Sequence, residues 1–308
     1  MAEATIKKPI AKIEKAQSNG APKKRLEILK TYKIYIGGKF PRTESGRYYS
    51  PENDEKEKLT NVCLSSRKDF REAVVAARKA QHSWAAKSAY NKGQILYRIA
   101  EMLEGRKTQF IEELMLQGST QAKAEKEVEL SIDRLVYYAG WSDKYQQVFS
   151  SVNPVESSHF NFSMAEPMGV ISALSSENFG LIGLVSLIAP AIVGGNTIIV
   201  LAASEKPLCA VTFGEVINSS DVPGGVVNIL TGHRAELLSH FANHMDVNAI
   251  LYSGDKPDEI SKIKELASLN VKRALIYKGN DEMNEDAQNG YRIMDTQEIK
   301  TTWHPVGQ

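Results

Sequence analysis

Small polar residues gather in four short turns, each of which lies between an apolar segment typical of a strand and one typical of a helix. These turns are SSENFG at 175–180 and the segments 201–206, 231–234 and 253–258. The N–H groups at the start of a helix attract anionic groups such as phosphates. On pattern alone, these turns are therefore the places where we expect a ligand to bind.

The elements that carry these turns alternate strictly from residue 168 onward. Apolar strands are predicted at 168–174, 196–202, 226–232, 249–254 and 272–279, with a helix between each pair. Strands that are apolar on both faces and separated by helices are typical of a parallel sheet with right-handed crossovers. We therefore predict an α/β fold with a doubly wound parallel sheet of the Rossmann-like, dinucleotide-binding type.

The chain before residue 150 predicts short strands followed by helices. YKIYIGGKF alternates apolar and polar residues around Gly37-Gly38, which indicates a hairpin. A further strand is predicted at 59–66. Apolar residues at helical spacing predict helices at 67–84, 91–119 and 124–145. These helices are expected to bury their aromatic side chains in the core.

The composition is that of an ordinary globular protein. The chain has 308 residues, of which 42% are hydrophobic and 24% charged, and its formal net charge is +1. This balance argues against a general attraction to nucleic acid or membranes, and no membrane-spanning segment is predicted. With only two cysteines, we expect reduced thiols and a cytoplasmic location. The lysine-rich residues 1–30 predict a basic flexible tail, with a docking arm as the alternative.

Six motifs follow one another between Tyr32 and Gly279: YIGGKF, YYAGWSDK, EPMGVISA, IAPAIVGGNTIIV, DVPGGVVNILTG and VKRALI. In this order and spacing they resemble the amino-terminal, coenzyme-binding half of an aldehyde dehydrogenase. The resemblance implies a NAD(P)-binding-type domain at 31–280, with an oligomerisation hairpin inserted at 146–166. TQEIKTTWHPVGQ resembles the carboxyl-terminal strand of these enzymes, which joins the sheet of a neighbouring subunit. Residues 281–308 are therefore predicted to form a loop and an oligomerisation strand.

The resemblance also implies roles for the turn residues. Asn178 matches the asparagine that helps to hold the oxyanion on the aldehyde carbon. Its residue type alone favours a simpler role as the cap of the helix at 181–193. The degenerate cofactor site implied by the resemblance consists of Ser175, Ser176, Asn178, Ser204, Gly232, Ser253 and Gly254.

Several residues depart from the family pattern around the expected cofactor. Leu201 replaces the lysine, and Ser204 the glutamate, that grip the adenosine ribose, and Glu205 comes one residue too late. Glu259 replaces a glycine of the phosphate-binding turn, and Asp255 is predicted to be the N-cap of the following helix, where it would repel a phosphate. We therefore expect no cofactor, and any NAD(P) binding is expected to be weak.

The groups that would perform the chemistry are also replaced. Tyr277 stands in place of the general-base glutamate, and a phenol with a pKa near 10 is a poor base at pH 7. We interpret Cys63 and Cys209 as small buried hydrophobes. We therefore predict no catalytic residue in this chain, because no cysteine is placed to act as the nucleophile.

Two histidine-containing patterns carry little weight. His240 and His244 are four residues apart, but they have too few carboxylates nearby for a metal site to be expected. His233-Arg234 follows a predicted strand and could contact an anion, but we interpret it as a solvated turn.

This sequence has the hairpin and the carboxyl-terminal strand of the family but lacks its nucleophilic cysteine and its general-base glutamate. In this combination it most resembles the degenerate, cysteine-less second module of two-module (family sixteen) aldehyde dehydrogenases. That resemblance implies that the catalytic domain is absent. We predict a non-catalytic pseudoenzyme subunit that assembles with a full-length aldehyde dehydrogenase or with itself. The alternatives are a NAD(P)-dependent oxidoreductase acting on aldehydes and a nucleotide-binding sensor without turnover. No nucleic-acid or membrane partner is expected.

Overall fold

The fold is seen in a computed structural model, which describes residues 30–53, 56–279 and 282–307. All of the elements named below belong to the compact unit Thr31–Gln308. The predicted basic tail at 1–30 lies outside the described residues, except for Lys30. In the described part of the chain, no helix combines the length and the apolar character that a membrane crossing requires.

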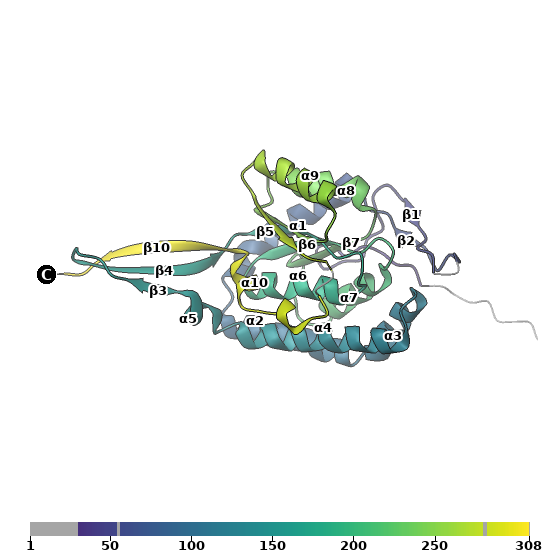
Figure 1. Ribbon diagram of the computed structural model, residues 1–308, viewed down its shortest axis with the longest axis horizontal. Coiled ribbons are helices and arrows are strands. Elements are labelled where there is room, and N and C mark those ends of the chain that lie inside the picture. The colour runs from purple at the N-terminus through teal and green to yellow at the C-terminus, as the bar shows by residue number, and fades with distance from the viewer. Residues whose placement is uncertain (1–29, 54–55, 280–281, 308) are drawn as a thin grey trace, which may run out of the picture. The chain divides into compact units, whose positions relative to one another are not determined.

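A five-stranded parallel sheet forms the centre of this unit (Figure 1). Its strands are β5 (Val170–Leu174), β6 (Thr197–Leu201), β7 (Val227–Leu230), β8 (Ala249–Ser253) and β9 (Arg273–Tyr277), in the spatial order β7-β6-β5-β8-β9. The chain places β6 and β7 on one side of β5 and then returns to place β8 and β9 on the other. The predicted doubly wound α/β fold is confirmed. The chain order reverses between β5 and β8, where such folds bind ligands.

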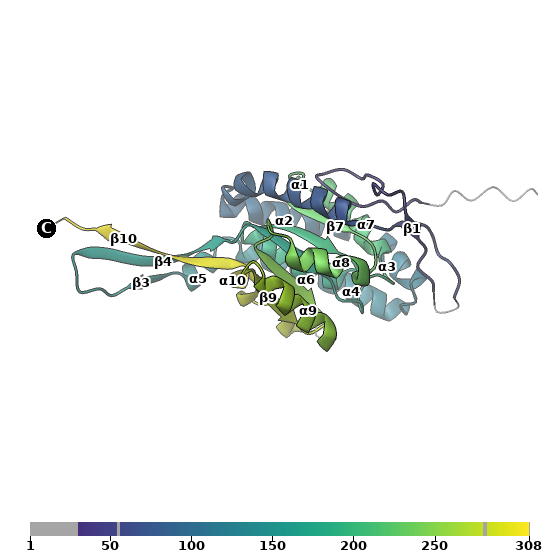
Figure 2. The ribbon, with the colours of Figure 1, turned by 90° about the horizontal axis from the view of Figure 1, so that it is seen from above.

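Helices cover both faces of the sheet, which explains why its strands are apolar on both sides. One face is covered by α6 (Ile182–Val193) and α7 (Leu208–Asn218), behind which lie α2 (Ala89–Glu104), α3 (Lys107–Leu116) and α4 (Gln121–Trp141). The other face is covered by α1 (Arg67–Ala85), α8 (Arg234–Asn243) and α9 (Pro257–Ser268), as Figures 1 and 2 show.

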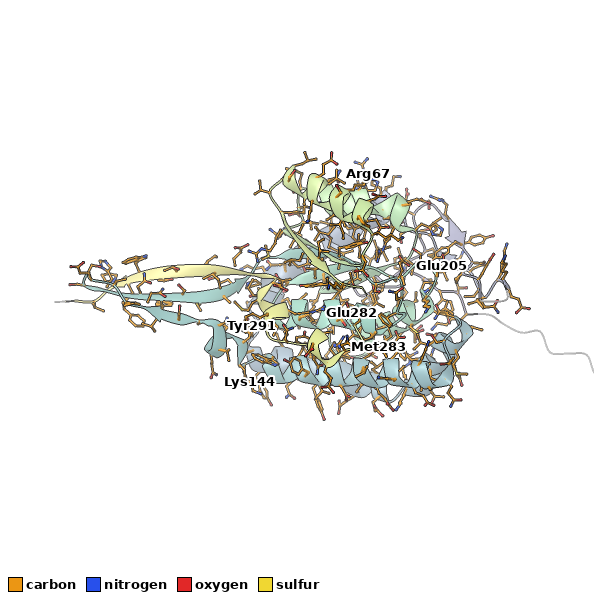
Figure 3. The ribbon with its side chains drawn as sticks, viewed as in Figure 1. Arg67, Lys144, Glu205, Glu282, Met283 and Tyr291 are labelled. Carbon is orange, nitrogen blue, oxygen red and sulfur yellow. The ribbon has the colours of Figure 1, made fainter. Side chains whose placement is uncertain are left out.

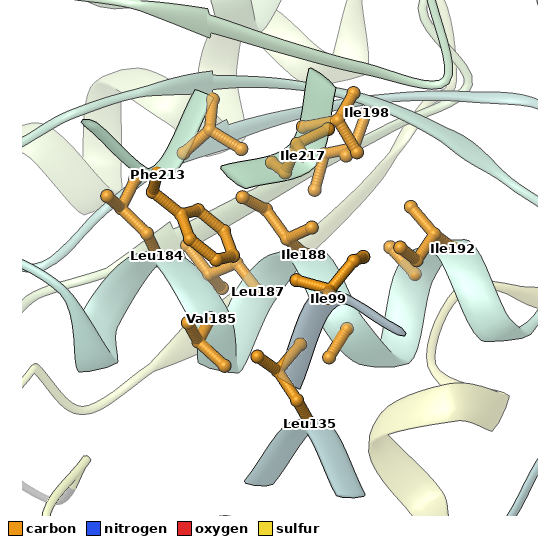
Figure 4. Close-up of a cluster of buried hydrophobic side chains, with 14 of the residues drawn as sticks. Ile99, Leu135, Leu184, Val185, Leu187, Ile188, Ile192, Ile198, Phe213 and Ile217 are labelled. Carbon is orange, nitrogen blue, oxygen red and sulfur yellow. The ribbon is translucent and has the colours of Figure 1, made fainter. Parts of the chain in front are cut away.

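Every residue of α6 is buried, because this helix lies between the sheet and the outer helices. In Figure 4, Ile188 of α6 lies between Ile99 of α2 and Ile198 of β6. Leu135 of α4 packs into the same cluster from the outer layer. Burying an aliphatic side chain of this size stabilises the fold by about 1.5–3 kcal/mol. The apolar sequence of α6 is therefore that of a core helix.

The helix predicted at 91–119 is in fact two helices, which is a correction to the periodicity argument. α2 ends at Glu104 with Gly105 as its C-cap, and α3 begins after Arg106. Glycine has a low helix propensity, which explains why the helix ends here. The apolar period continues across this point, so it did not reveal the break. The prediction for 67–84 is confirmed by α1, whose N-cap Ser66 and Asp69 form a capping box.

The predicted Gly37-Gly38 hairpin is confirmed as a tight turn. Ile36 and Lys39 exchange two backbone hydrogen bonds of 3.0 Å each. Gly37 and Gly38 have φ angles of 60° and 78°, which favour glycine. The flanking residues form isolated bridges, and the nearby strands β1 (Tyr48–Tyr49) and β2 (Val62–Cys63) are short.

A separate three-stranded antiparallel sheet, called here the arm, extends from the helices and the central sheet (Figure 1). It consists of β3 (Ser151–Asn153), β4 (His159–Pro167) and β10 (Gln297–Pro305), in the order β10-β4-β3. The short helix α5 (Tyr145–Phe149) precedes the arm, and the 3-10 turn η1 (Glu285–Ala287) and helix α10 (Tyr291–Met294) lead into β10. The segment after β9 was expected to be a loop, and within it the structure contains the short helices η1 and α10.

The carboxyl-terminal strand was expected to join the sheet of a neighbouring subunit. In the structure, β10 pairs along its full length with β4 of its own chain, from Gln297 opposite Pro167 to Pro305 opposite His159. The hairpin and the terminal strand therefore form one sheet within the chain, of which β10 and β3 are the two edge strands.

Candidate functional site

A pocket of about 550 Å³ opens at the carboxyl ends of the central strands, where the sequence predicted a ligand site. Its walls come from the turns after β5, β6, β7 and β8 and from the first turns of α8 and α9. The residues that line it are mostly charged: Glu177, Ser204, Glu205, His233, Arg234, Ala235, Leu238, Lys256, Asp258, Glu259 and Lys262. The four turns predicted from the sequence therefore do come together in space.

Arg234, the first residue of α8, is the central group of this site. Its side chain is only 6% exposed, and it lies between two carboxylates. Arg234 Nε is 3.0 Å from Glu177 Oε1, and Nη1 is 3.1 Å from Glu259 Oε2. Nη2 donates to the carbonyl oxygens of Ser175 and Ser253. The interpretation of His233-Arg234 as a solvated turn is wrong for Arg234, because the order of the strands brings these acceptors around it.

Glu177 also contacts Ser204, which stands in place of the glutamate that grips the ribose in the resembled pattern. The backbone N–H of Ser204 donates to Glu177 Oε2 at 2.7 Å, and its hydroxyl lies 3.3 Å from Glu177 Oε1. The Ser204 hydroxyl also donates to the carbonyl oxygen of Gly232 at 3.1 Å. Ser204 and Gly232 are thus brought together as predicted, but their hydrogen bonds are made within the chain.

The start of α9, where a phosphate would be expected, holds the carboxylate of Glu259. Tyr252 donates its hydroxyl to Glu259 Oε2 at 2.8 Å, and the Arg234 guanidinium lies 5.1 Å from the centre of the Tyr252 ring. Burial raises the pKa of Tyr252 to about 12, and the hydrogen bond to Glu259 adds to that shift. Burial opposes ionisation of Glu259, but the Tyr252 hydrogen bond and the Arg234 charge together hold its pKa below the usual value.

Asp255 does not cap α9, and this prediction is wrong. The N-cap is Lys256, and no side chain makes a capping hydrogen bond there. The helix begins one residue later than predicted, because Pro257 occupies the first helical position, to which its fixed φ is suited. The acidic side chains of the first helical turn are Asp258 and Glu259.

Asn178 does not cap α6 either. The N-cap is Leu181, and the backbone N–H groups of Leu181 and Ile182 donate to Glu127 Oε1 at 2.7 and 3.2 Å. Glu127 is a buried residue of α4, and burial raises the pKa of its carboxyl group against the opposing effect of these hydrogen bonds. The capping group thus comes from another helix, 54 residues away in sequence. The residues next to α6 could not have indicated it.

Asn178 and Ser176 instead hold the chain that leaves β9. The Ser176 hydroxyl donates to the carbonyl oxygen of Gly279 at 2.8 Å, and Asn178 Nδ2 lies 3.4 Å from the same oxygen. The neighbouring Ser175 is buried, and its carbonyl oxygen accepts from Arg234. These predicted cofactor residues therefore meet at the site but bind other parts of the chain.

The other side of the site is filled from the segment that follows β9. The Ser253 hydroxyl donates to Glu282 Oε1 at 2.9 Å. Glu282 is fully buried between the central sheet and α4 (Figure 3), and its second oxygen lies 3.6 Å from Arg134 Nη1 and 3.8 Å from Arg292 Nη1. A methyl group added at Gly254 would meet the Tyr252 hydroxyl at 2.6 Å, so this glycine is covered by its own chain.

Tyr277, at the position of the family's general base, is bound within the chain. Its hydroxyl donates to Asp295 Oδ2 at 2.7 Å, and the Arg292 guanidinium lies 4.2 Å from the centre of its ring. Burial raises the pKa of this phenol well above its usual value, and the Asp295 charge raises it further. A phenol that remains protonated across the physiological range cannot take a proton from water or from a thiol.

The two cysteines are buried, as predicted. Cys63 is 7% exposed, and Cys209 is fully buried with its Sγ 3.7 Å from the carbonyl oxygen of Phe110. Neither residue lines the pocket described above. Among the residues that the structure describes, no three His, Cys, Asp or Glu side chains gather as metal ligands.

The sequence did not identify Glu177 or Glu127 as residues of the site, and it gave Arg234 the wrong role. One signal for Glu177 was present: an acidic residue lies in the turn where the resembled pattern has a tryptophan. No local sequence pattern around Glu127 or Arg234 identifies the partners of these residues, because the partners lie on other elements.

Comparison with known proteins relates the chain to one family. The model described as "Aldehyde dehydrogenase family" matches residues 41–282. Retinal dehydrogenase 2 of Mus musculus is 31% identical over 296 residues, which make up 92% of this chain and 56% of that protein. Aldehyde dehydrogenase 1A1 of Gallus gallus is 31% identical over 273 residues, which make up 85% of this chain and 52% of that protein.

The fold is also shared with solved structures. The NAD+ complex of an aldehyde dehydrogenase from Bacillus cereus matches with a TM-score of 0.76 and 23% identity, over 80% of this chain and 50% of that one. The chain spans about half the length of the curated relatives that it matches.

Proposed function

The chain belongs to the aldehyde dehydrogenase family, and we propose that it is a cytoplasmic, non-catalytic member that acts by assembling with other subunits. It most resembles the degenerate second module of two-module aldehyde dehydrogenases. The partner in this proposal is a full-length aldehyde dehydrogenase or a second copy of the chain. The observation that carries the proposal is the ion-pair network of Glu177, Arg234 and Glu259, which lines the cleft in which the fold would place a dinucleotide.

The network opposes nucleotide binding in two ways. A phosphate at the start of α9 would meet the Glu259 carboxylate, and like charges repel at short range. Arg234, the group best suited to bind a phosphate, already makes two ion pairs and two hydrogen bonds to carbonyl oxygens. Each hydrogen bond to a charged group is worth about 1.5–3 kcal/mol, so a dinucleotide would have to replace several of them before gaining affinity.

The positions of the chemical groups support the same proposal. Tyr277 replaces the base and is held by Asp295 and Arg292. Cys63 and Cys209 lie in the hydrophobic core, where a thiol is inert. Meanwhile the arm presents strand edges and exposed apolar side chains, which are the features that bind other chains.

The proposal is tested by three measurements on the purified full chain. Calorimetry with NAD and NADP should give no binding heat up to millimolar nucleotide, and incubation with aldehydes should form no reduced cofactor. A tagged chain should co-purify with a full-length aldehyde dehydrogenase or with an untagged copy. Aldehyde turnover by the isolated chain, retained after Cys63→Ala and Cys209→Ala, would instead support an oxidoreductase.

A nucleotide-binding sensor without turnover is the second candidate. The observation that favours it is the remaining pocket of about 550 Å³, which lies within the size range of small-molecule sites and carries Lys256 and Lys262 at its rim. Saturable nucleotide binding without aldehyde oxidation would select this candidate over the assembling subunit.

A further inference from the structure

The Glu282 carboxylate is buried next to two arginine side chains, near the centre of the view in Figure 3. The Glu282 side chain has no exposed surface, and those of Arg134 and Arg292 are 1% and 11% exposed. Arg134 comes from α4, Arg292 from α10 and Glu282 from the segment after β9. This cluster is separate from the pocket around Arg234, because none of its three side chains lines that pocket.

Glu282 forms a hydrogen bond on one side of the cluster but not on the other. Its Oε1 accepts from the Ser253 hydroxyl at 2.9 Å. Its Oε2 is 3.6 Å from Arg134 Nη1 and 3.8 Å from Arg292 Nη1. Charge-assisted hydrogen bonds are shorter, about 2.7–2.9 Å. Within the described chain, Glu282 Oε2, Arg134 Nε and Arg292 Nη1 are buried without a hydrogen-bond partner.

The two guanidinium groups need an anion beside them. A charge that is buried without a partner of opposite charge is costly. Burial lowers the pKa of Arg134, and the Glu282 charge opposes this shift. The hydrogen bonds of Arg134 go to neutral groups, the Ser186 hydroxyl and the carbonyl oxygen of Asn284. Among the described residues, Glu282 is the only acidic side chain within ion-pair distance of Arg134 or Arg292.

A free carboxylate could fit these donors better than Glu282 does. The backbone and the Ser253 hydrogen bond hold the Glu282 carboxylate in place, whereas a free ion can move until it lies at hydrogen-bond distance from the guanidinium groups. Guanidinium groups match the planar carboxylate with its two acceptor oxygens. The donors that Glu282 leaves unused, Arg134 Nε and Arg292 Nη1, are available for such an ion.

We propose that Ser253, Arg134 and Arg292 form a binding site for a small carboxylate, and that Glu282 occupies this site from within the chain. Glu282 is then an autoinhibitory contact, because an external carboxylate enters only when the segment that carries Glu282 withdraws. That segment continues through η1 and α10 into β10. The contact therefore also holds the start of the connection to the arm against the central sheet.

Complementation of a cavity variant by acetate tests the site. Glu282→Ala removes a fragment with the same heavy atoms as acetate. We expect this variant to unfold at lower urea concentration than the wild type and to regain stability when acetate is added at constant ionic strength. With an apparent dissociation constant of about 10 mM, about 100 mM acetate raises the folding equilibrium constant about tenfold. The wild type should not respond, because Glu282 fills its site.

The choice of ion separates a carboxylate site from a general effect of salt. Acetamide has the shape of acetate without its charge and should not restore stability. Propionate is longer by one methylene group and should act more weakly than acetate, because the space left by the Glu282 side chain is closed. Inorganic phosphate is larger than a carboxylate and should have no effect. A response to phosphate or acetamide equal to that to acetate would overturn the carboxylate assignment.

Three variants serve as controls. In Glu282→Gln the side chain still fills the site, so acetate should not change its stability. Glu285→Ala removes an exposed carboxylate of the same segment and should behave like the wild type. Adding Arg134→Leu to Glu282→Ala removes the more deeply buried cation, so the response to acetate should fall at least about tenfold.

The inference is overturned if the urea midpoint of a folded Glu282→Ala variant does not change with acetate, or changes as much as that of Glu285→Ala. If Glu282→Ala is unfolded in buffer, circular dichroism during an acetate titration becomes the measurement. Folding that depends on acetate supports the site, and a chain that stays unfolded at every acetate concentration refutes it. None of these measurements involves a nucleotide, an aldehyde or a second subunit, so their result is independent of the proposed function.

Discussion

Replacing Arg234 with leucine tests whether the ion-pair network of Arg234, Glu177 and Glu259 stabilises the domain. The variant leaves Glu177 and Glu259 without their shared cation and leaves the carbonyl oxygens of Ser175 and Ser253 without a donor. Removing one partner of a buried ion pair costs about 3–5 kcal/mol. The Glu177 and Glu259 side chains are 27% and 19% exposed, so water can solvate them in part. We therefore expect a loss near the lower limit, about 3 kcal/mol.

Urea unfolding followed by circular dichroism measures this loss. With an m-value of about 3 kcal/mol/M, a loss of about 3 kcal/mol lowers the unfolding midpoint by about 1 M. Arg47→Leu is the matched control, because Arg47 also forms a two-point ion pair with a glutamate, Glu236, but both side chains are exposed. Exposed pairs contribute little to stability, because water screens both charges. Equal midpoints for Arg234→Leu and Arg47→Leu would refute the reasoning.

A triple variant separates charge from packing. The loss of unfolding free energy in Arg234→Leu is expected to come from the two carboxylates that are left without a cation. In that case, adding Glu177→Gln and Glu259→Gln to Arg234→Leu should recover more than half of the lost free energy. If the stability does not recover, the Arg234 side chain acts through its packing on Tyr252, and the ion pairs contribute little to the stability.

Three further predictions concern the same site. Glu177→Ser with Glu259→Gly should raise the affinity for NAD at least about tenfold, because it frees Arg234 for a phosphate, and unchanged affinity in calorimetry would contradict this. Glu127→Ala should lower the free energy of unfolding by about 3 kcal/mol, because two buried N–H groups lose their acceptor, while the exposed Glu112→Ala should change it by less than about 0.5 kcal/mol. The folded pKa of Glu259 lies below its unfolded value, so its contribution is present above the unfolded pKa and is lost as the pH falls through the folded one. Urea midpoints across that pH range should fall less for Glu259→Gln than for the wild type.

The central fold could be predicted from the sequence because its signals are local. Apolar strands alternating with helices specify a parallel sheet covered on both faces, and each such segment carries its own period. The burial of Cys63 and Cys209 was predictable for the same reason, since both lie in apolar elements. The helix boundaries were less predictable: at Gly105 the apolar pattern continues where the backbone turns.

The candidate site could be located from the sequence but not described. Ser175, Ser176, Asn178, Ser204, Gly232, Ser253 and Gly254 lie at the predicted edge of the sheet, because the carboxyl ends of parallel strands meet there. What each side chain binds was decided by the strand order β7-β6-β5-β8-β9, which brings the turns after β5 and β8 against the start of α8.

The sequence by itself determined which segments become strands and helices, and which end of the sheet carries polar turns, because these depend on the spacing of neighbouring residues. Only the tertiary structure decided that Arg234 pairs with Glu177 and Glu259, that Glu127 of another helix caps α6, and that β10 pairs with β4 of its own chain. These contacts join residues that lie far apart along the chain. Their energy depends on distance and burial, which no local pattern contains.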